Sequence, residues 1–322
     1  MLMIIASVSS FEIHGQTDSS FTPHGKPLAL IFSNVNYTFN NEGNSKAFEV
    51  TRAYLGYEYY FSKKISSRLT LDFGDPGAGE LQMTAFLKYA FVQYKGDKFS
   101  ARFGMIGTDI FSLQENHWGY RYIYKSFQDA YKFGPAADLG AAFEYSPHKI
   151  ISFDFSLLNG EGYKKVQLDS VFKTTVGLTL KPFKGFLLRG YIDVMDNDFT
   201  QTSAAFFAGY AIKRFKAGLE YNMQKNNAMI SGNDFSGISV YASLGVAEKL
   251  TIFSRYDNLR SAIPENETDP WNLNKDGQLF IAGFDYSPVK GVKIAPTYLG
   301  YAPYDKSLSF TSRFGLYFEL RF

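Results

Sequence analysis

The alternation of apolar and polar residues is clearest at the C-terminal end of the chain. One parity carries Phe310, Phe314, Leu316, Phe318, Leu320 and Phe322, and the other carries Thr311, Arg313, Gly315, Tyr317, Glu319 and Arg321. A period of two predicts a β-strand with two unlike faces. Strands of soluble proteins usually hold about 5 to 6 residues, whereas a tilted membrane strand needs about 9 to 11. The length of this stripe therefore predicts a membrane-spanning strand that ends at Phe322.

The same alternation recurs along the chain and predicts about sixteen strands, an even number that suits an antiparallel barrel with both termini on one side. They begin near residues 28, 47, 65, 84, 98, 136, 150, 171, 186, 203, 215, 237, 249, 278, 291 and 309. In residues 84–95 two sets of apolar residues compete for the outer face. This conflict indicates a β-bulge or a register irregularity there.

The connections between these strands alternate in length. Tight turns such as Lys213-Arg214 alternate with longer polar segments, as expected for periplasmic turns and extracellular loops. The longest connection, residues 107–135, is rich in aromatic residues: Trp118, Tyr120, Tyr122, Tyr124, Phe127 and Tyr131. Loops of this length are uncommon unless they have a function. Either this loop constricts a pore and stacks a planar or sugar-like solute, or its aromatic side chains anchor it by burial.

Composition supports a barrel and limits the partners. Aromatic residues make up 18% of the chain, with 23 Tyr and 32 Phe, which exceeds the need of one soluble core. No apolar stretch is long enough for a membrane helix, and the mean hydropathy is −0.17, as for strands whose two faces average out. The net charge of +2 indicates no nucleic-acid partner. We therefore predict an all-β, transmembrane antiparallel β-barrel over residues 17–322.

Residues 1–16 form an apolar run with small residues. This pattern is similar to the end of a secretory signal peptide, although the positively charged start is missing. We expect a signal-peptide remnant here; an N-terminal arm is the alternative.

Catalytic and metal-binding patterns are missing from the sequence. The chain has no Cys, and its four His residues have no ligand spacing, so we expect no metal and no cofactor. His117 lies in the long loop and His148 in a tight turn, and neither is beside a Ser of a predicted strand. A hydrolase would need such a nucleophile and base. We therefore expect no enzyme activity.

Several segments resemble the phosphate-selective porin family of types O and P, particularly its relatives in Bacteroidota. They are residues 48–56 (FEVTRAYLG), 87–95 (LKYAFVQYK), 102–105 (RFGM), 111–115 (FSLQE), 138–140 (DLG), 158–162 (LNGEG), 254–257 (SRYD) and 294–296 (IAP). Each motif is weak alone, and their order is the stronger signal. The resemblance implies a barrel of sixteen strands, often trimeric, whose third extracellular loop folds inward and narrows the pore; residues 107–135 are in that position.

The charges depart from the family's pattern, because its phosphate selectivity comes from concentrated basic residues. Here the candidates for the pore lining and the constriction mix both signs: Arg52, Arg68, Asp72, Arg102, Glu115, Arg121, Lys125, Asp154, Arg189, Asp193, Arg255, Asp257, Arg313 and Glu319. Mixed charges favour weak ion preference. Alternatively, these residues pair across strands and only stiffen the wall.

The sequence thus predicts a porin of the outer membrane of a Gram-negative bacterium, which lets small hydrophilic solutes or ions diffuse through a water-filled barrel. The alternative is a porin-like barrel with a blocked pore that serves as a structural or assembly subunit of a larger outer-membrane complex. The expected partners are outer-membrane lipid and lipopolysaccharide, the barrel-assembly machinery, and a homotrimer or other outer-membrane subunits. We expect Phe322 to be the barrel-insertion signal.

Overall fold

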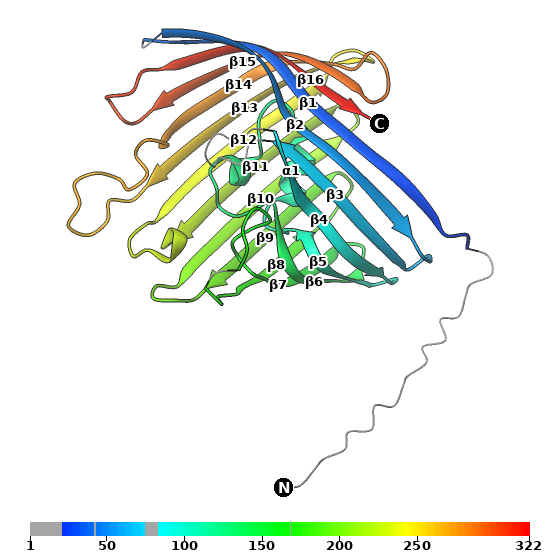
Figure 1. Cartoon of the computed structure of the whole chain (residues 1–322). Helices are drawn as coiled ribbons and strands as arrows, with labels where there is room; N and C mark the ends of the chain where they lie inside the picture. Colours follow the sequence, from blue (N-terminus) through cyan, green and yellow to red (C-terminus); the bar gives the residue numbers. More distant parts are fainter. Residues whose placement is uncertain (1–20, 42, 75–82, 168) are drawn as a thin grey trace.

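The structure is a computed structural model, and it describes residues 21–41, 43–74, 83–167 and 169–322. The predicted signal-peptide remnant, residues 1–16, lies outside the described residues. Sixteen strands form one closed barrel in which each strand pairs with its sequence neighbours and β1 pairs with β16 (Figure 1). The first eight are β1 (His24–Asn40), β2 (Gly43–Tyr60), β3 (Ile65–Gly74), β4 (Thr84–Lys95), β5 (Phe99–Gly107), β6 (Ala137–His148), β7 (Ile151–Leu158) and β8 (Lys173–Leu180).

The second half of the barrel has the same up-and-down order. It consists of β9 (Phe186–Met195), β10 (Gln201–Ile212), β11 (Phe215–Lys225), β12 (Phe235–Gly245), β13 (Leu250–Ser261), β14 (Gly277–Tyr286), β15 (Val292–Pro303) and β16 (Thr311–Arg321). All the pairings are antiparallel, including β1 with β16, where Leu30 lies opposite Arg321. The prediction of an all-β antiparallel barrel with sixteen strands is confirmed. Several strands begin a few residues from the predicted positions; β1 begins at His24 instead of near residue 28.

Short helices interrupt two of the connections and were not predicted. They are α1 (Ser112–Trp118), α2 (Phe127–Ala130) and the 3₁₀-helix η1 (Asn227–Met229). Among the described residues, no helix is both long and apolar enough to cross a membrane.

The outer face of the barrel is apolar, whereas the interior holds the buried polar and charged side chains together with two apolar clusters. Leu69, Val176 and Phe314 are each more than half exposed on the outer face. Asn222 and Asp257, which have the opposite parity on their strands, are buried inside. Because side chains of a strand alternate between its two faces, the period-two pattern of the sequence produces this separation. Such an exterior is typical of a lipid-facing barrel.

A β-bulge on β4 explains the conflict of apolar residues in that strand. The register with β3 shifts between Thr70 and Leu71, which leaves Lys88 as the extra residue. Leu87 faces outward, whereas Lys88 is 5% exposed and points into the barrel. Beyond the bulge the parity changes, so that Val92 faces outward. The predicted irregularity in residues 84–95 is therefore confirmed.

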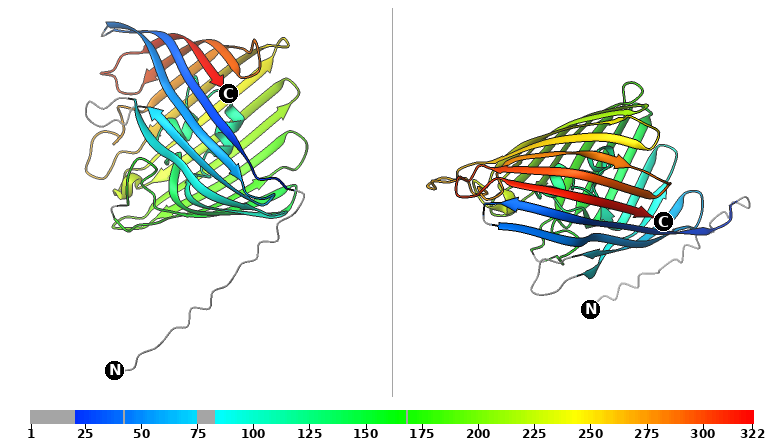
Figure 2. Two further views of the ribbon diagram at one scale, coloured as in Figure 1. Left: turned by 45° about the vertical axis from the view of Figure 1, so that its right-hand side comes forward. Right: turned by 90° about the horizontal axis from the view of Figure 1, so that it is seen from above.

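The two ends of the barrel differ in their connections (Figure 2). At the turn end, Lys213 and Arg214 alone join β10 to β11. Phe322 lies at this end, where its N–H donates to the carbonyl of Ala29 at 3.0 Å. The longer connections lie at the opposite end, called the loop end here. The longest of them, residues 108–136, joins β5 to β6 and carries α1 and α2.

Candidate functional site

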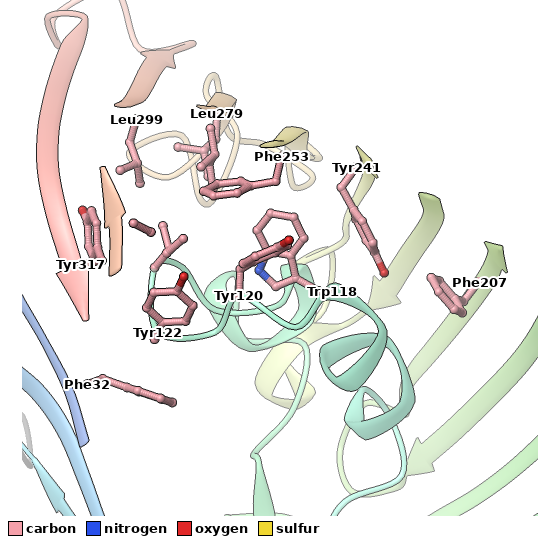
Figure 3. Close-up of a cluster of buried hydrophobic side chains, with 13 residues drawn as sticks. Phe32, Trp118, Tyr120, Tyr122, Phe207, Tyr241, Phe253, Leu279, Leu299 and Tyr317 are labelled. Atoms are coloured by element: carbon pink, nitrogen blue, oxygen red, sulfur yellow. The ribbon is translucent and has the colours of Figure 1, made fainter. Parts of the chain in front are cut away.

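Residues 108–136, called the inner loop here, lie inside the barrel and pack on one half of its wall (Figures 1 and 3). The indole of Trp118 contacts the ring of Tyr241 on β12, with centroids 5.1 Å apart, and Tyr120 stacks on Phe253 of β13 at 4.5 Å. Tyr122 lies in the same buried cluster as Phe32 of β1. The aromatic residues therefore bind the loop to the wall by burial.

A second apolar cluster anchors the following part of the inner loop. Phe127 and Phe133 are fully buried, and they pack with Phe235 of β12 and Leu259 of β13. The rings of Phe133 and Phe235 have centroids 4.3 Å apart. With both clusters, the inner loop covers strands β9 to β16 and reaches β1.

Side chains of the wall also hold the main chain of the inner loop. Arg255 of β13 donates from Nη1 to the carbonyl of Lys125 at 2.7 Å, and Lys216 of β11 donates to the carbonyl of Trp118 at 2.9 Å. The second bond places a cation at the C-terminal end of α1, where carbonyl groups lack helical partners. Gln224 of β11 likewise donates to the carbonyl of Phe133 at 2.9 Å. These bonds fix the backbone of the loop in position.

The inner loop carries an ion-pair network of its own. Arg121 donates from Nε to Glu115 and from Nη2 to Asp129, both at 2.8 Å, and its Nη1 reaches the hydroxyl of Tyr54 on β2 at 3.4 Å. Burial raises the pKa of Glu115 above its usual value, with Arg121 opposing the shift. Burial also acts to raise the pKa of Asp129, but Arg121 and Lys125 outweigh it and lower that pKa. The loop therefore presents closely spaced charges of both signs.

The wall from β2 to β9 carries paired charges that face the inner loop. Arg52 contacts Asp72 at 3.1 Å and Arg68 contacts Glu58 at 3.3 Å, in both cases between β2 and β3. The other wall pairs are Arg189–Asp154 at 2.7 Å and Lys173–Asp193 at 3.8 Å. Arg102 of β5 pairs with Asp109 of the inner loop at 2.8 Å. Both signs alternate around this half, so they produce no basic concentration.

The remaining candidate residues lie on the half that the inner loop covers. Arg255 binds Asp257 through two hydrogen bonds of 2.7 Å, and both side chains are almost completely buried. Glu319 pairs with Lys293 at 3.4 Å, and Arg313 donates to the hydroxyl of Thr38 at 3.0 Å. The structure thus divides the fourteen predicted residues between two halves of the interior. Arg52, Asp72, Glu115 and Arg121 come together around Tyr54.

Lys88 is an interior residue that the sequence did not reveal. Its Nζ donates to the hydroxyl of Tyr54 at 3.2 Å and lies 4.5 Å from the centre of the Tyr54 ring. The ring centres of Tyr89 and Tyr163 are 5.6 and 5.9 Å away. The bulge hides Lys88 from a strict period of two. The two competing sets of apolar residues in β4 were the one signal of the bulge in the sequence.

The space that the inner loop leaves uncovered lies along β2 to β8. At the turn end it includes a polar cavity of about 390 Å³, lined by Arg102, Asp109, Glu144, Lys149 and Asp154 among others. Lys125 of the inner loop is 45% exposed. This half therefore combines accessible charges with space, whereas the other half is filled by aromatic side chains.

Solved structures of outer-membrane proteins share this fold. OprB of Pseudomonas putida gives a TM-score of 0.72 at 9% identity, covering 92% of this chain and 94% of that chain. OmpF of Salmonella typhi gives 0.70 at 12% identity, covering 92% and 97%, and the outer membrane channel DcaP of Acinetobacter baumannii gives 0.69 at 12% identity, covering 93% and 97%. At these identities the likeness concerns the fold alone.

Comparison of the sequence itself gives no assignment. No protein-family model and no curated protein matches it. The resemblance to the phosphate-selective porins therefore stays a prediction, and the feature shared with the solved structures is the fold.

Proposed function

We propose that this chain is an outer-membrane porin through which small hydrophilic solutes diffuse passively. The observation that carries the proposal is the asymmetric interior, in which one half is sealed by the inner loop and the other keeps accessible charges and space. Sixteen strands leave room for an aqueous lumen. An apolar outer face suits lipid, and long loops opposite tight turns suit an extracellular and a periplasmic side.

We further propose that the inner loop is the constriction and that ion selectivity is weak. Arg52, Lys88, Arg102, Arg121 and Lys125 bring positive charge to the passage. The carboxylates Asp72, Asp109, Glu115 and Asp129 lie among them at ion-pair distances. Because alternating charges produce local fields and little net potential, cations and anions both find favourable positions.

Planar-bilayer conductance of the purified protein tests this function. We expect stable single channels, and reversal potentials close to zero in a gradient of potassium chloride. A strong anion preference would contradict weak selectivity and favour the phosphate-selective interpretation. A silent protein that co-purifies with other outer-membrane components would overturn the channel and support a blocked structural subunit.

Three expectations stay predictions: the homotrimer, the contacts with lipopolysaccharide and the assembly machinery, and the role of Phe322 in insertion. Cross-linking of the protein in native membranes tests the oligomer. Replacement of Phe322, followed by measurement of barrel assembly, tests the insertion signal.

A further inference from the structure

The segment after β7, residues 159–165, folds toward the interior at the loop end. Gly160 and Gly162 have φ angles of 107° and 85°, in the region that favours glycine. Their N–H groups donate to the carboxylate of Asp138 at 2.6 and 3.3 Å. The N–H of Tyr163 donates to the carbonyl of Ala137 at 2.9 Å. These bonds fix the segment to the start of β6.

From this base, Tyr163 reaches across to the opposite side of β5. Its hydroxyl donates to Oδ2 of Asp72 on β3 at 2.7 Å. Its ring meets Phe86 of β4 edge to face, with centroids 6.4 Å apart. The segment leaves the wall at β7 and contacts it again at β3 and β4. It therefore crosses over β4 to β6, within the part of the interior that the inner loop leaves uncovered.

Residues 159–165, which reach β3 through Tyr163, are called the bridge here. Further contacts around Tyr163 fix the bridge in position. Asp72 is completely buried and also accepts from Arg52, so the tyrosine hydroxyl joins an existing ion pair. Burial raises the pKa of Tyr163, and Asp72 raises it further, so the hydroxyl keeps its proton and donates it. A hydrogen bond to a carboxylate is shorter and stronger than a neutral one. The bridge is thus a defined contact between the start of β6 and the end of β3.

The bridge joins the inner-loop network, because Asp72 lies opposite Tyr54 in the register of β2 and β3, and Nζ of Lys88 lies 4.5 Å from the Tyr54 ring and 5.9 Å from the Tyr163 ring. Asp72 and Phe86 are near the loop-end termini of β3 and β4, and Ala137 begins β6 at the same end. A Cβ on Gly162 would meet Pro135, so the segment lies against the last residues of the inner loop. Tyr163 therefore adds to the side chains of the inner-loop network on the side of β3 and β4.

We infer that Tyr163 extends the constriction of the inner loop toward β3 and β4 and limits the size of the solute that can pass. The inference rests on the proposed porin function. It predicts compact polar solutes and hydrated ions as the permeating class, and exclusion of bulky, branched solutes at the level of the inner-loop network.

Single-channel conductance with graded polyethylene glycols added on the loop side tests this inference. Tyr163→Ala should raise conductance by up to roughly twofold and admit larger glycols from that side. Tyr163→Phe keeps the ring and removes the hydroxyl, so it should give a smaller rise. Tyr304→Ala is the matched control: its hydroxyl accepts from Asn258 and Gln278, over the half that the inner loop fills. We expect wild-type conductance from this control.

A thiol reagent gives a test on the folded channel. The chain has no Cys, so Tyr163→Cys introduces its one thiol. Reaction with a bulky, membrane-impermeant methanethiosulfonate should lower the conductance of this variant and leave Tyr304→Cys unchanged. A conducting wild type whose Tyr163 variants keep wild-type conductance, glycol cut-off and insensitivity to the reagent would overturn the role of Tyr163 in the constriction alone. A silent wild type rejects the proposed function and this inference with it.

Discussion

Both halves of the interior contain pairs of opposite charge, but the two halves differ in how deeply the pairs are buried and in what surrounds them. Along β9 to β16, aromatic side chains of the inner loop fill the space, and the charged pair Arg255–Asp257 is almost fully buried. Along β2 to β8, the pair Arg68–Glu58 keeps exposed fractions of 33% and 22%. The first half positions the loop, and the second half lines the proposed passage. The comparison shows that the position of the inner loop follows from packing on one side, and under the proposed function the conductance depends on the charges left on the other.

Breaking one ion pair in each half should give the largest contrast. Arg255→Met leaves Asp257 and the neighbouring Glu220 buried without their cation, and we expect a loss of about 3–5 kcal/mol in the free energy of unfolding. Arg68→Met removes a partly solvated pair, and we expect about 0–1 kcal/mol. Urea unfolding of the barrel in detergent measures both. Equal losses would contradict the division into a sealed and an accessible half.

Removing an aromatic anchor tests the packing more locally. Trp118→Ala removes a fully buried indole, and we expect it to weaken the docking of the inner loop by about 3 kcal/mol while the strands keep the barrel closed. The variant should show protease cleavage within the inner loop and noisier single-channel currents. Phe183→Ala, in a tight turn where the ring is 60% exposed, is the control and should change neither. A protected loop in the Trp118 variant would show that the hydrogen bonds to the wall suffice.

Both halves were partly predictable from the sequence, for different reasons. The strands were predictable because a period of two is a local property of the sequence. The bulge at Lys88 was also visible there, as a conflict between Leu87 and Val92 for the outer face. The partner of Arg189 was not predictable: Arg189 of β9 reaches Asp154 of β7 across the intervening β8, a contact that depends on barrel curvature and side-chain length. Neither was the reach of Tyr163 to Asp72, because a loop residue shows no periodicity.

Acidification should loosen the sealed half through His117. Burial, with a smaller contribution from Lys216, lowers the pKa of His117 to about 4, and its Nδ1 lies 3.0 Å from the Tyr241 hydroxyl. An undocked loop would titrate near the usual value of about 6.5 and bind more protons, so docking weakens as the pH falls from about 6.5 to about 4.

The variant His117→Asn separates the effect of His117 from the effects of other titratable side chains. Glu115, whose pKa is raised, acts in the opposite direction and is present in both proteins. We therefore expect current noise to increase at acid pH in the wild type and to increase less in the variant. Identical pH profiles would show that His117 does not couple to docking.

The smallest expected effect concerns selectivity in the accessible half. Lys125 is 45% exposed and pairs with Asp129 at 3.4 Å, so Lys125→Gln removes one solvated positive charge from the passage. We expect a slight shift of the reversal potential toward cation preference, with little change in stability. Lys184→Gln, in an exposed turn between β8 and β9, should leave the reversal potential unchanged. A shift of equal size in both variants would contradict a passage lined by Lys125.

Side chains of the wall hold the inner loop largely by hydrogen bonds to its main-chain carbonyls, those of Lys125, Trp118 and Phe133. A hydrogen bond to a main-chain carbonyl does not depend on the side chain of the residue that accepts it. During evolution, or in a designed library, residues such as Asn116 and Lys125 could therefore vary while the loop keeps its place. Under the proposed function, the barrel can acquire a new solute preference through a few loop substitutions, without any repacking of its scaffold.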